Sequence, residues 1–169
     1  MEGRVAVRPL TGDDWRLKRD MRLAALKDSP AAFISTYARE AKRSELDWRS
    51  WPAGGAFFAA FGPPPGLRRR AGCDVPLGIA AAWVAAARPA TTHLISMWVV
   101  PAARGNGIAA QLADAVTGWA AGRGHRTVEL EIACGNTAAL RAYLRCGFTP
   151  TGREPFTGGG TVLVRTVGR

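Results

Sequence analysis

Residues Trp98–Gln111, with the sequence WVVPAARGNGIAAQ, indicate how the rest of the chain is organised. An apolar segment stops at Pro101, Gly105 and Gly107 follow closely, and an alanine-rich amphipathic segment begins there. This order predicts a buried strand, a tight turn and the start of a helix. Because the first turn of a helix leaves backbone N–H groups without partners, the segment predicts a seat for a phosphate or pyrophosphate, with Arg104 adding positive charge.

The glycine pair is a weak signal when it is taken without its surroundings. A Gly-x-Gly pair also occurs in plain turns that cap helices. The loop has no Gly-Lys-Ser/Thr of a P-loop, and it lacks the third small residue and the later acidic residue of a dinucleotide fingerprint. Its position between a strand and a helix favours a phosphate-type ligand of another kind.

The same segment resembles a family signature. Residues 104–109, RGNGIA, are similar to the R/Q-x-x-G-x-G/A signature of the GCN5-related N-acetyltransferases (GNAT). Downstream, Asn136, Ala139, Tyr143, Gly147 and Phe148 have the spacing of that family's second acetyl-CoA motif. The resemblance is strong over about residues 91–150, and elsewhere it rests on the order of the expected elements.

The resemblance implies a mixed α/β fold with a mostly antiparallel sheet of seven strands, about four flanking helices, and a splay between strands four and five. Sequence patterns predict strands at 5–10, 55–61, 77–87, 93–100, 127–133, 148–152 and 161–167. They predict helices at 11–27, 38–49, 107–123 and 136–146. We expect residues 1–169 to form one N-acetyltransferase domain.

The resemblance also implies acetyl-CoA as cosubstrate, with no metal. Backbone groups of the splayed fourth strand would bind the pantetheine arm as an extra strand does, and one N–H would polarise the thioester carbonyl. The expected cofactor-binding residues are Trp98, Val99, Val100, Arg104, Gly105, Asn106, Gly107, Ile108, Ala109, Asn136, Ala139 and Tyr143.

The general acid implied by the resemblance is Tyr143. A departing thiol with a pKa of about 8.5 needs a proton, and a well-placed phenol can supply it. The alternative is that Tyr143 only packs on the cofactor arm, just as Asn136 has the alternative role of a helix N-cap.

The general base is less well defined. His93 and Glu129 are the catalytic candidates, with Glu131 on the same strand face as Glu129 and water as a possible proton relay. His93 stands where many relatives carry a strand carboxylate, so a satisfied strand histidine is an equal alternative. Cys134 has no assigned histidine or asparagine partner, which favours direct transfer in a ternary complex over a covalent intermediate.

The expected acceptor is a primary amine of a small molecule, such as a metabolite or an antibiotic. Candidate acceptor contacts are Phe33, Tyr37, His93 and Glu131, with core packing as the alternative for the aromatic residues. One alternative function is acetylation of a peptide or protein amine, although no dominant acidic cluster favours a polycationic substrate. The other is a non-catalytic module that binds CoA or nucleic acid.

Composition limits the remaining classes. The net charge of +10 favours anionic partners, but most arginines are dispersed, so nucleic acid is not the expected partner. Arg68–Arg70, in a loop rich in Pro and Gly, either contact an acidic group such as the 3′-phosphate of CoA or are solvated. Three cysteines without metal-type spacing fit a reducing, cytoplasmic setting. No apolar run predicts a membrane span or a signal peptide. The expected assembly is a monomer or a homodimer.

Overall fold

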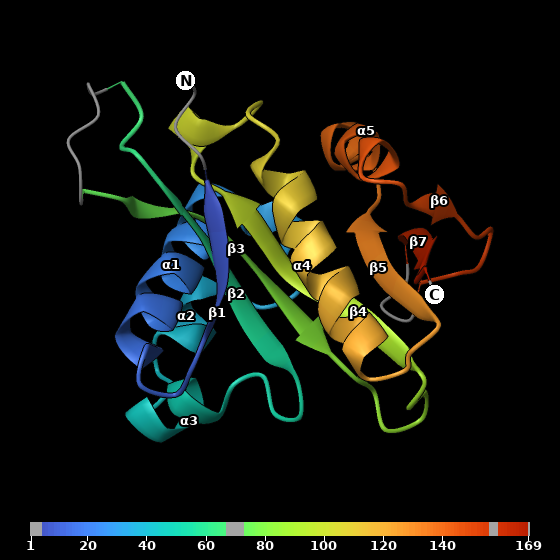
Figure 1. Cartoon of the computed structure of the whole chain (residues 1–169), viewed down its shortest axis with the longest axis horizontal. Coiled ribbons are helices and arrows are strands. Elements are labelled where there is room, and N and C mark those ends of the chain that lie inside the picture. The colour runs from blue at the N-terminus through green and yellow to red at the C-terminus, as the bar shows by residue number, and fades with distance from the viewer. Residues whose placement is uncertain (1–4, 67–72, 156–158, 169) are drawn as a thin grey trace.

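The computed structural model describes residues 5–66, 73–155 and 159–168. Within these ranges seven strands form one sheet in the order β1-β2-β3-β4-β5-β7-β6 (Figure 1). The strands are β1 (Ala6–Leu10), β2 (Ala56–Gly62), β3 (Val75–Trp83), β4 (Thr91–Val99), β5 (Thr127–Ala133), β6 (Thr149–Pro150) and β7 (Gly160–Thr166). All neighbouring strands are antiparallel except β4 and β5, which run parallel. The predicted mixed, mostly antiparallel sheet is therefore confirmed.

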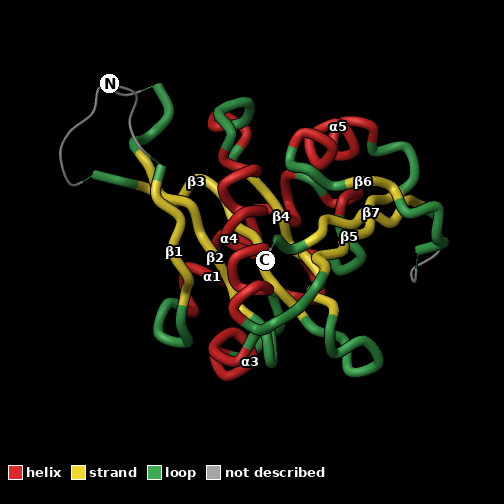
Figure 2. The backbone as a smooth tube through the Cα atoms, turned by 45° about the vertical axis from the view of Figure 1, so that its right-hand side comes forward, coloured by secondary structure: helices red, strands yellow, loops and turns green. Residues whose placement is uncertain are grey.

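Five α-helices occur in the described part of the chain, one more than predicted. They are α1 (Trp15–Asp28), α2 (Tyr37–Glu40), α3 (Glu45–Ser50), α4 (Ile108–Gly122) and α5 (Thr137–Arg145), and there are two 3-10 turns, η1 (Pro30–Ala32) and η2 (Pro101–Ala103). The helix α4 crosses in front of the strands in Figure 1, whereas α1 lies behind them, and the tube in Figure 2 shows the same two layers.

A separate hydrophobic core fills the space between each helix layer and the sheet. On one face Leu112 and Val116 of α4 pack against Leu94 and Val128. On the other face Met21 and Ala25 of α1 pack against strand residues that alternate with those facing α4. These strand residues are Phe57, Ala59, Ile79, Ala81 and Trp98. The alternation of strand side chains between two covered faces explains why these strands are apolar almost throughout.

A β-bulge interrupts β4 in the middle. Ile79 pairs with Trp98 and Ala81 pairs with Ile95, so Ser96 and Met97 together face the single residue between Ile79 and Ala81. Ser96 has φ of 60°, a left-handed conformation that serine rarely adopts. The extra residue changes the alternation, so that Leu94 and Met97 both face the α4 core while Ile95 and Trp98 face the α1 core.

The strands β4 and β5 pair only briefly. Their ladder consists of Thr91, Thr92 and His93 against Thr127, Val128 and Glu129. After His93 the strand β4 continues through the bulge along β3, while β5 continues along β7. The predicted splay between the fourth and fifth strands is therefore present, and it opens on the side of the bulge.

The second predicted helix is wrong in its extent. In place of one helix over 38–49, α2 ends at Glu40 and α3 begins at Glu45. Ser44 is the reason, because its side chain accepts the Asp47 N–H at 3.2 Å while the Asp47 carboxylate accepts the Ser44 N–H at 2.8 Å. This reciprocal capping box starts a new helix at a position where the apolar pattern alone suggested continuity.

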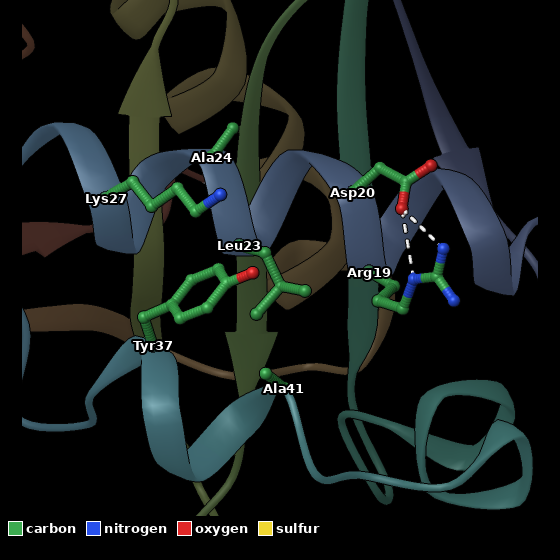
Figure 3. A pocket seen from close by; sticks show the side chains of 7 residues that line it. All are labelled: Arg19, Asp20, Leu23, Ala24, Lys27, Tyr37 and Ala41. Carbon is green, nitrogen blue, oxygen red and sulfur yellow. Dashed lines mark hydrogen bonds and ion pairs between the residues drawn. The ribbon is translucent and has the colours of Figure 1, made fainter.

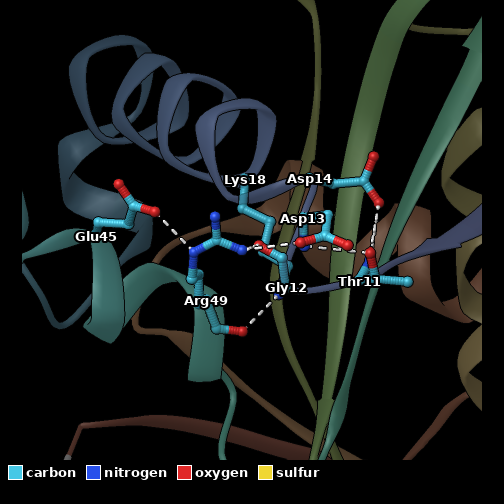
Figure 4. A network of polar contacts seen from close by, with 7 residues as sticks. All are labelled: Thr11, Gly12, Asp13, Asp14, Lys18, Glu45 and Arg49. Atoms are coloured by element: carbon cyan, nitrogen blue, oxygen red, sulfur yellow. Dashed lines mark hydrogen bonds and ion pairs between the residues drawn. The ribbon is translucent and has the colours of Figure 1, made fainter.

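A polar network connects the start of α1 to α3 (Figure 4). Asp14 accepts the Thr11 N–H at 2.8 Å, which fixes the turn before α1, and the helix itself begins at Trp15. The Arg49 guanidinium bonds Asp13 at 2.9 Å and Glu45 at 2.7 Å. Lys18, although buried, donates to the Trp51 carbonyl at 3.0 Å, and burial lowers the pKa of its ammonium. These contacts hold the start of α1 against α3 and the residue that follows it.

Other boundaries shift by a few residues, and β3 shows the clearest physical cause. It ends at Trp83 rather than at 87, because the Arg88 N–H donates to Ala85 and the chain turns there. The arginines Arg68–Arg70 lie outside the described residues. No helix in the described ranges is both long and apolar enough to cross a membrane.

Candidate active site

The loop between β4 and α4 has the geometry predicted for binding an anion. Gly105 and Gly107 adopt φ of 84° and 73°, and a Cβ added at either would meet nothing within 4 Å. Gly107 is the N-cap of α4, and no side chain among the described residues caps its first turn. The first N–H groups of α4, at Ile108 and Ala109, are therefore available to an anion at the positive end of the helix dipole.

Two side chains stabilise this loop from within. Asn106 Nδ2 donates to the Ala103 carbonyl at 3.1 Å. Arg104 does not extend from the loop but folds back, because its Nε donates to the Val99 carbonyl at 3.0 Å and its Nη2 bonds Asp28. The Arg104 guanidinium therefore lies beside the loop, where Asp28 of α1 and the Val99 carbonyl of β4 hold it.

The backbone of β4 beyond the bulge presents groups to the split, the region beyond His93 and Glu129 where β4 and β5 have separated. The Val100 N–H donates to the Leu77 carbonyl at 2.8 Å, so Val100 points to β3. Successive strand residues point their backbone groups to opposite edges, so those of Val99, and of Met97 before it, point to the side that β5 has left. The Trp98 backbone points to β3, while its side chain lies in the α1 core.

The second motif forms the start and body of α5. The Asn136 side chain accepts the Ala139 N–H at 3.1 Å, which confirms the predicted N-cap. Ala139 and Tyr143 pack against the α4 core. The Tyr143 ring meets Phe148 edge-on, 5.7 Å between centroids. Burial raises the pKa of its phenol, with a smaller effect from Cys146, so the hydroxyl keeps its proton at neutral pH.

His93 lies on the opposite face of the sheet, at the end of the short ladder. Its ring is tilted against Trp83, 5.5 Å between centroids, and its Nε2 is buried without a hydrogen-bond partner in the described structure. Burial lowers the pKa of His93, and smaller effects come from Glu129 and Glu131, which raise it, and from Arg88 and Arg153, which lower it. The imidazole is therefore neutral at pH 7 and able to accept a proton.

Glu129, the ladder partner of His93, is buried and held by two arginines. Arg88 donates to it at 2.5 and 2.8 Å, and Arg153 at 2.7 Å. Burial opposes ionisation of Glu129, yet the two guanidinium groups prevail and its pKa is lowered. Glu131 follows on the same strand face and is exposed.

Of the predicted acceptor residues, the two aromatic ones lie at separate places beside α1. Phe33 is half-buried, follows η1, and carries the Arg22 guanidinium over its ring at 4.5 Å. Tyr37 lies in a groove of about 460 Å³ between α1 and α2, where the Lys27 ammonium is 4.6 Å from its ring centre and the two helices line the walls (Figure 3). Trp48 and Trp51 pack edge-on in the core beneath α3, 6.0 Å between centroids.

Three residues at the site carry no recognisable signal in the sequence. Asp28 joins the end of α1 to both Trp98 and Arg104. Ser96 takes the left-handed conformation of the bulge, and the backbone N–H and C=O of Met97 then point to the split. A lone aspartate before Ser-Pro and a serine in an apolar strand form no pattern, so only the fold identifies them. No group of three or more metal-ligating side chains occurs in the described ranges.

Several solved structures share this fold over nearly the whole chain. A PaiA N-acetyltransferase from Thermoplasma acidophilum, in complex with coenzyme A, aligns with a TM-score of 0.70 at 13% identity, covering 96% of this chain and 99% of that chain. A GCN5-related N-acetyltransferase from Kribbella flavida gives 0.70 at 20% identity, covering 96% and 97%. YncA, a putative acetyltransferase from Salmonella typhimurium with acetyl-CoA, gives 0.67 at 19% identity, covering 98% and 95%.

These identities are low, so the structural likeness establishes the fold alone. No curated protein matches the chain significantly. The model of the acetyltransferase (GNAT) family matches residues 22–148, which is well over half of the chain and includes the split and the loop between β4 and α4. The two motifs, the β4 bulge and the seven-stranded sheet agree with that match. The chain belongs to the GNAT family of acetyltransferases.

Proposed function

We propose that this protein transfers an acetyl group from acetyl-CoA to a primary amine of a small molecule, such as a metabolite or an antibiotic, within a ternary complex. The observation that carries the proposal is the split between β4 and β5, which stands next to the uncapped first turn of α4. The split suits the extended pantetheine arm of acetyl-CoA, which contains amides. The first turn of α4 suits the diphosphate attached to that arm. We also propose that residues 1–169 form a single domain.

The split and the loop fit acetyl-CoA in chemistry as well as in position. Pantetheine contains two amides, which can pair with the backbone groups of Met97 and with the N–H of Val99, whose carbonyl already accepts from Arg104 Nε. The free N–H groups at residues 107–109 and the helix dipole suit a pyrophosphate. Related structures with coenzyme A and with acetyl-CoA support this choice of ligand. The bound thioester would supply the activated acetyl group.

The two proton-handling side chains lie on different faces of the sheet. His93 faces the α1 layer, and Tyr143 packs on the α4 side. The split is the opening in the sheet between those layers. An amine can therefore approach a thioester held there from the His93 side, while the sulfur of the thioester remains towards Tyr143. This arrangement supports separate routes for the proton that leaves the amine and the proton that reaches the sulfur.

The proposed reaction balances without another reactant. The neutral amine forms the new C–N bond to the carbonyl carbon, and the C–S bond breaks. The proton lost by nitrogen passes to His93 directly or through water, and the sulfur takes a proton from Tyr143. A backbone N–H of Met97 or Val99 stabilises the negative charge that develops on the carbonyl oxygen. The products are an amide and free CoA, and proton exchange with solvent then returns His93 to its neutral form and Tyr143 to its protonated form.

We propose His93 rather than Glu129 as the base. The Glu129 carboxylate already accepts hydrogen bonds from Arg88 and Arg153, and its lowered pKa makes it a weak proton acceptor. The buried Nε2 of His93 has no such partner in the described structure. Glu129 would instead hold the two arginines near the ring and set the charge around it.

One observation keeps peptide and protein amines as the second candidate class. The groove between α1 and α2 lies on the outside of the helix layer, and among the described residues that line it Asp20 is the one acidic side chain, beside Arg19 and Lys27. An open groove of mixed charge would also accommodate a peptide segment. A function limited to binding nucleic acid or CoA has weaker support, because it gives no role to the neutral His93 or the protonated Tyr143.

The test is release of free thiol from acetyl-CoA in the presence of single amines, with mass spectrometry of the acetylated product. We expect turnover with at least one small primary amine, and none with its tertiary analogue, which lacks the proton that the mechanism removes. Turnover with peptides alone would favour the second class. No turnover with either class, together with salt-sensitive binding to a DNA fragment, would favour the binding module.

A further inference from the structure

The carboxylate of Asp28, the last residue of α1, connects three parts of the molecule that are far apart in sequence. Its Oδ2 accepts from the Trp98 indole Nε1 at 2.9 Å and from the Ser29 hydroxyl at 2.7 Å, and it also bonds Nη2 of Arg104. Trp98 belongs to β4 beyond the bulge, and Arg104 belongs to the anion-binding loop. One carboxylate thus fixes the end of α1 to both parts of the proposed acetyl-CoA site.

The residues after Asp28 lie against the other side of the split. The 3-10 turn η1, which begins two residues later, lies against β5. The segment 28–32 therefore runs from β4 to β5 across the place where their ladder has ended. Figure 1 shows α1 behind the sheet, so this connection crosses the split on the α1 face.

The split needs such a connection because β4 has lost half of its lateral support. Beyond His93, and within the part of the chain that the structure describes, the strand β4 is paired with β3 alone. Two parallel strands with free backbone groups gain hydrogen bonds when they close on each other, and they lose orientation when nothing holds them apart. A charged hydrogen bond to a side chain of β4, combined with the close approach of the following turn to β5, links both edges.

We propose that Asp28 is a positioning residue for acetyl transfer, and that the segment 28–32 is a brace that holds the β4–β5 split at the width that fits the pantetheine arm. This inference rests on the proposed function, since it assigns the split to acetyl-CoA. Asp28 does not touch the reacting atoms. It acts through Trp98, whose own backbone neighbours, Met97 and Val99, line the split.

The electrostatics of Asp28 fit a permanent connection rather than a switch. A carboxylate at the C-terminal end of a helix is repelled by the helix dipole. The hydrogen bonds from Trp98 and Ser29 nevertheless outweigh the effect of burial and, together with Arg104, lower the pKa of Asp28 to about 2. The brace is therefore charged and intact throughout the physiological pH range.

The test compares two ligands that share the nucleotide but differ in the arm. Acetyl-CoA contains pantetheine, and adenosine 3′,5′-bisphosphate does not. We expect the full-length Asp28→Ala variant to bind acetyl-CoA about tenfold more weakly than the wild type, because it loses hydrogen bonds to a charged group. Its affinity for adenosine 3′,5′-bisphosphate should change by less than about threefold, since that ligand does not enter the split and Arg104 keeps its bond to the Val99 carbonyl. Calorimetry measures both.

The matched control is Asp13→Ala, which removes another ion-paired aspartate at the opposite end of α1. It should leave both affinities unchanged. Trp98→Phe, which keeps an aromatic ring but removes the N–H, should weaken acetyl-CoA binding in the wild type and have little further effect in Asp28→Ala. Should Asp28→Ala fail to fold, Asp28→Asn takes its place, with a smaller expected loss because the amide oxygen still accepts from Trp98.

The outcomes separate this inference from the proposed function. Wild-type affinity for acetyl-CoA in a folded Asp28 variant would overturn the brace and leave the function standing. An equal loss for both ligands would also overturn it, since that result indicates a general structural role. No binding of acetyl-CoA to the wild-type protein would overturn the proposed function and the brace together.

Discussion

His93 and Glu129 form the last residue pair of the ladder between β4 and β5, and beyond this pair the two strands separate. A titratable ring and a buried carboxylate thus stand at the point where the proposed acetyl-CoA cleft begins. The carboxylate is committed to Arg88 and Arg153, whereas the ring nitrogen Nε2 has no partner in the described structure. This difference assigns different roles to the pair, and each role has a test.

The variant His93→Gln should remove the acid limb of the pH–rate profile. The pKa of His93 lies below its ordinary value of 6.5, so the wild-type rate should fall only at pH values below 6.5. Loss of the base should lower kcat about a hundredfold and leave a profile flat through that region. Steady-state kinetics at pH values on both sides of 6.5 measure this. An unchanged acid limb in the variant would assign the titration to another group.

The same pKa shift predicts a stability effect. Since His93 has a lower pKa folded than unfolded, protonation favours the unfolded chain. Its contribution is complete above pH 6.5 and is lost as the pH falls through the folded-state pKa. Urea titrations measure the free energy of unfolding. As the pH falls below 6.5, this free energy should decrease less steeply in His93→Gln than in the wild type.

The variant Glu129→Gln distinguishes the two candidate bases. Glu129 raises the pKa of His93 and two nearby arginines lower it, so removal of the carboxylate charge should move the acid limb to lower pH. Activity should persist at neutral pH if His93 is the base. A complete loss of turnover in a folded Glu129→Gln protein, with acetyl-CoA binding intact, would instead identify Glu129 as the base.

The variant Tyr143→Phe should separate binding from transfer. The phenol is protonated at neutral pH, because burial raises its pKa, and the variant keeps the ring that packs on Phe148. We expect kcat to fall about a hundredfold while the Kd for acetyl-CoA stays within about twofold of the wild type. Equal turnover in both proteins would show that Tyr143 only packs beside the cofactor arm.

Gly78 of β3 and Gly118 of α4 test the packing behind the site. A Cβ at Gly78 would lie 2.9 Å from the Trp98 carbonyl oxygen and 3.2 Å from Leu112, so Gly78→Ala should cost about 2 kcal/mol of unfolding free energy. Gly118 is exposed on α4 and its added Cβ would meet nothing within 4 Å. Gly118→Ala should stabilise the protein by about 0.5–1 kcal/mol, because alanine favours the helix. Chemical unfolding curves of both variants provide the comparison.

The elements with strong local patterns could be predicted from the sequence. The strand β5 occurs at the predicted residues, α4 begins one residue after the predicted start, and Asn136 caps α5 as expected. Each has a local cause: alternation on β5, the glycine turn before α4, and an N-cap side chain. The family motifs then implied the splay, which the short β4–β5 ladder confirms.

Most features that could not be predicted depend on contacts between distant residues. Ser44 is the local exception, since it starts a new helix through Asp47 within a longer apolar pattern. The bulge at Ser96 is set by register against β3, and the Asp28–Trp98 bond joins residues 70 positions apart. The commitment of Glu129 to two arginines arises from Arg88 in a loop and Arg153 after β6. No local sequence pattern indicates contacts between residues that lie so far apart in the chain.

The central claim is that this chain binds acetyl-CoA in the β4–β5 split and transfers its acetyl group. The most direct measurement is calorimetric titration of the purified protein with acetyl-CoA, beside adenosine 3′,5′-bisphosphate, which lacks the pantetheine arm. We predict saturable one-to-one binding of acetyl-CoA that is at least about tenfold tighter than binding of the nucleotide fragment. Equal affinity for both ligands would show that the split does not hold the arm, and absence of acetyl-CoA binding would contradict the assignment of an acetyltransferase activity to this chain.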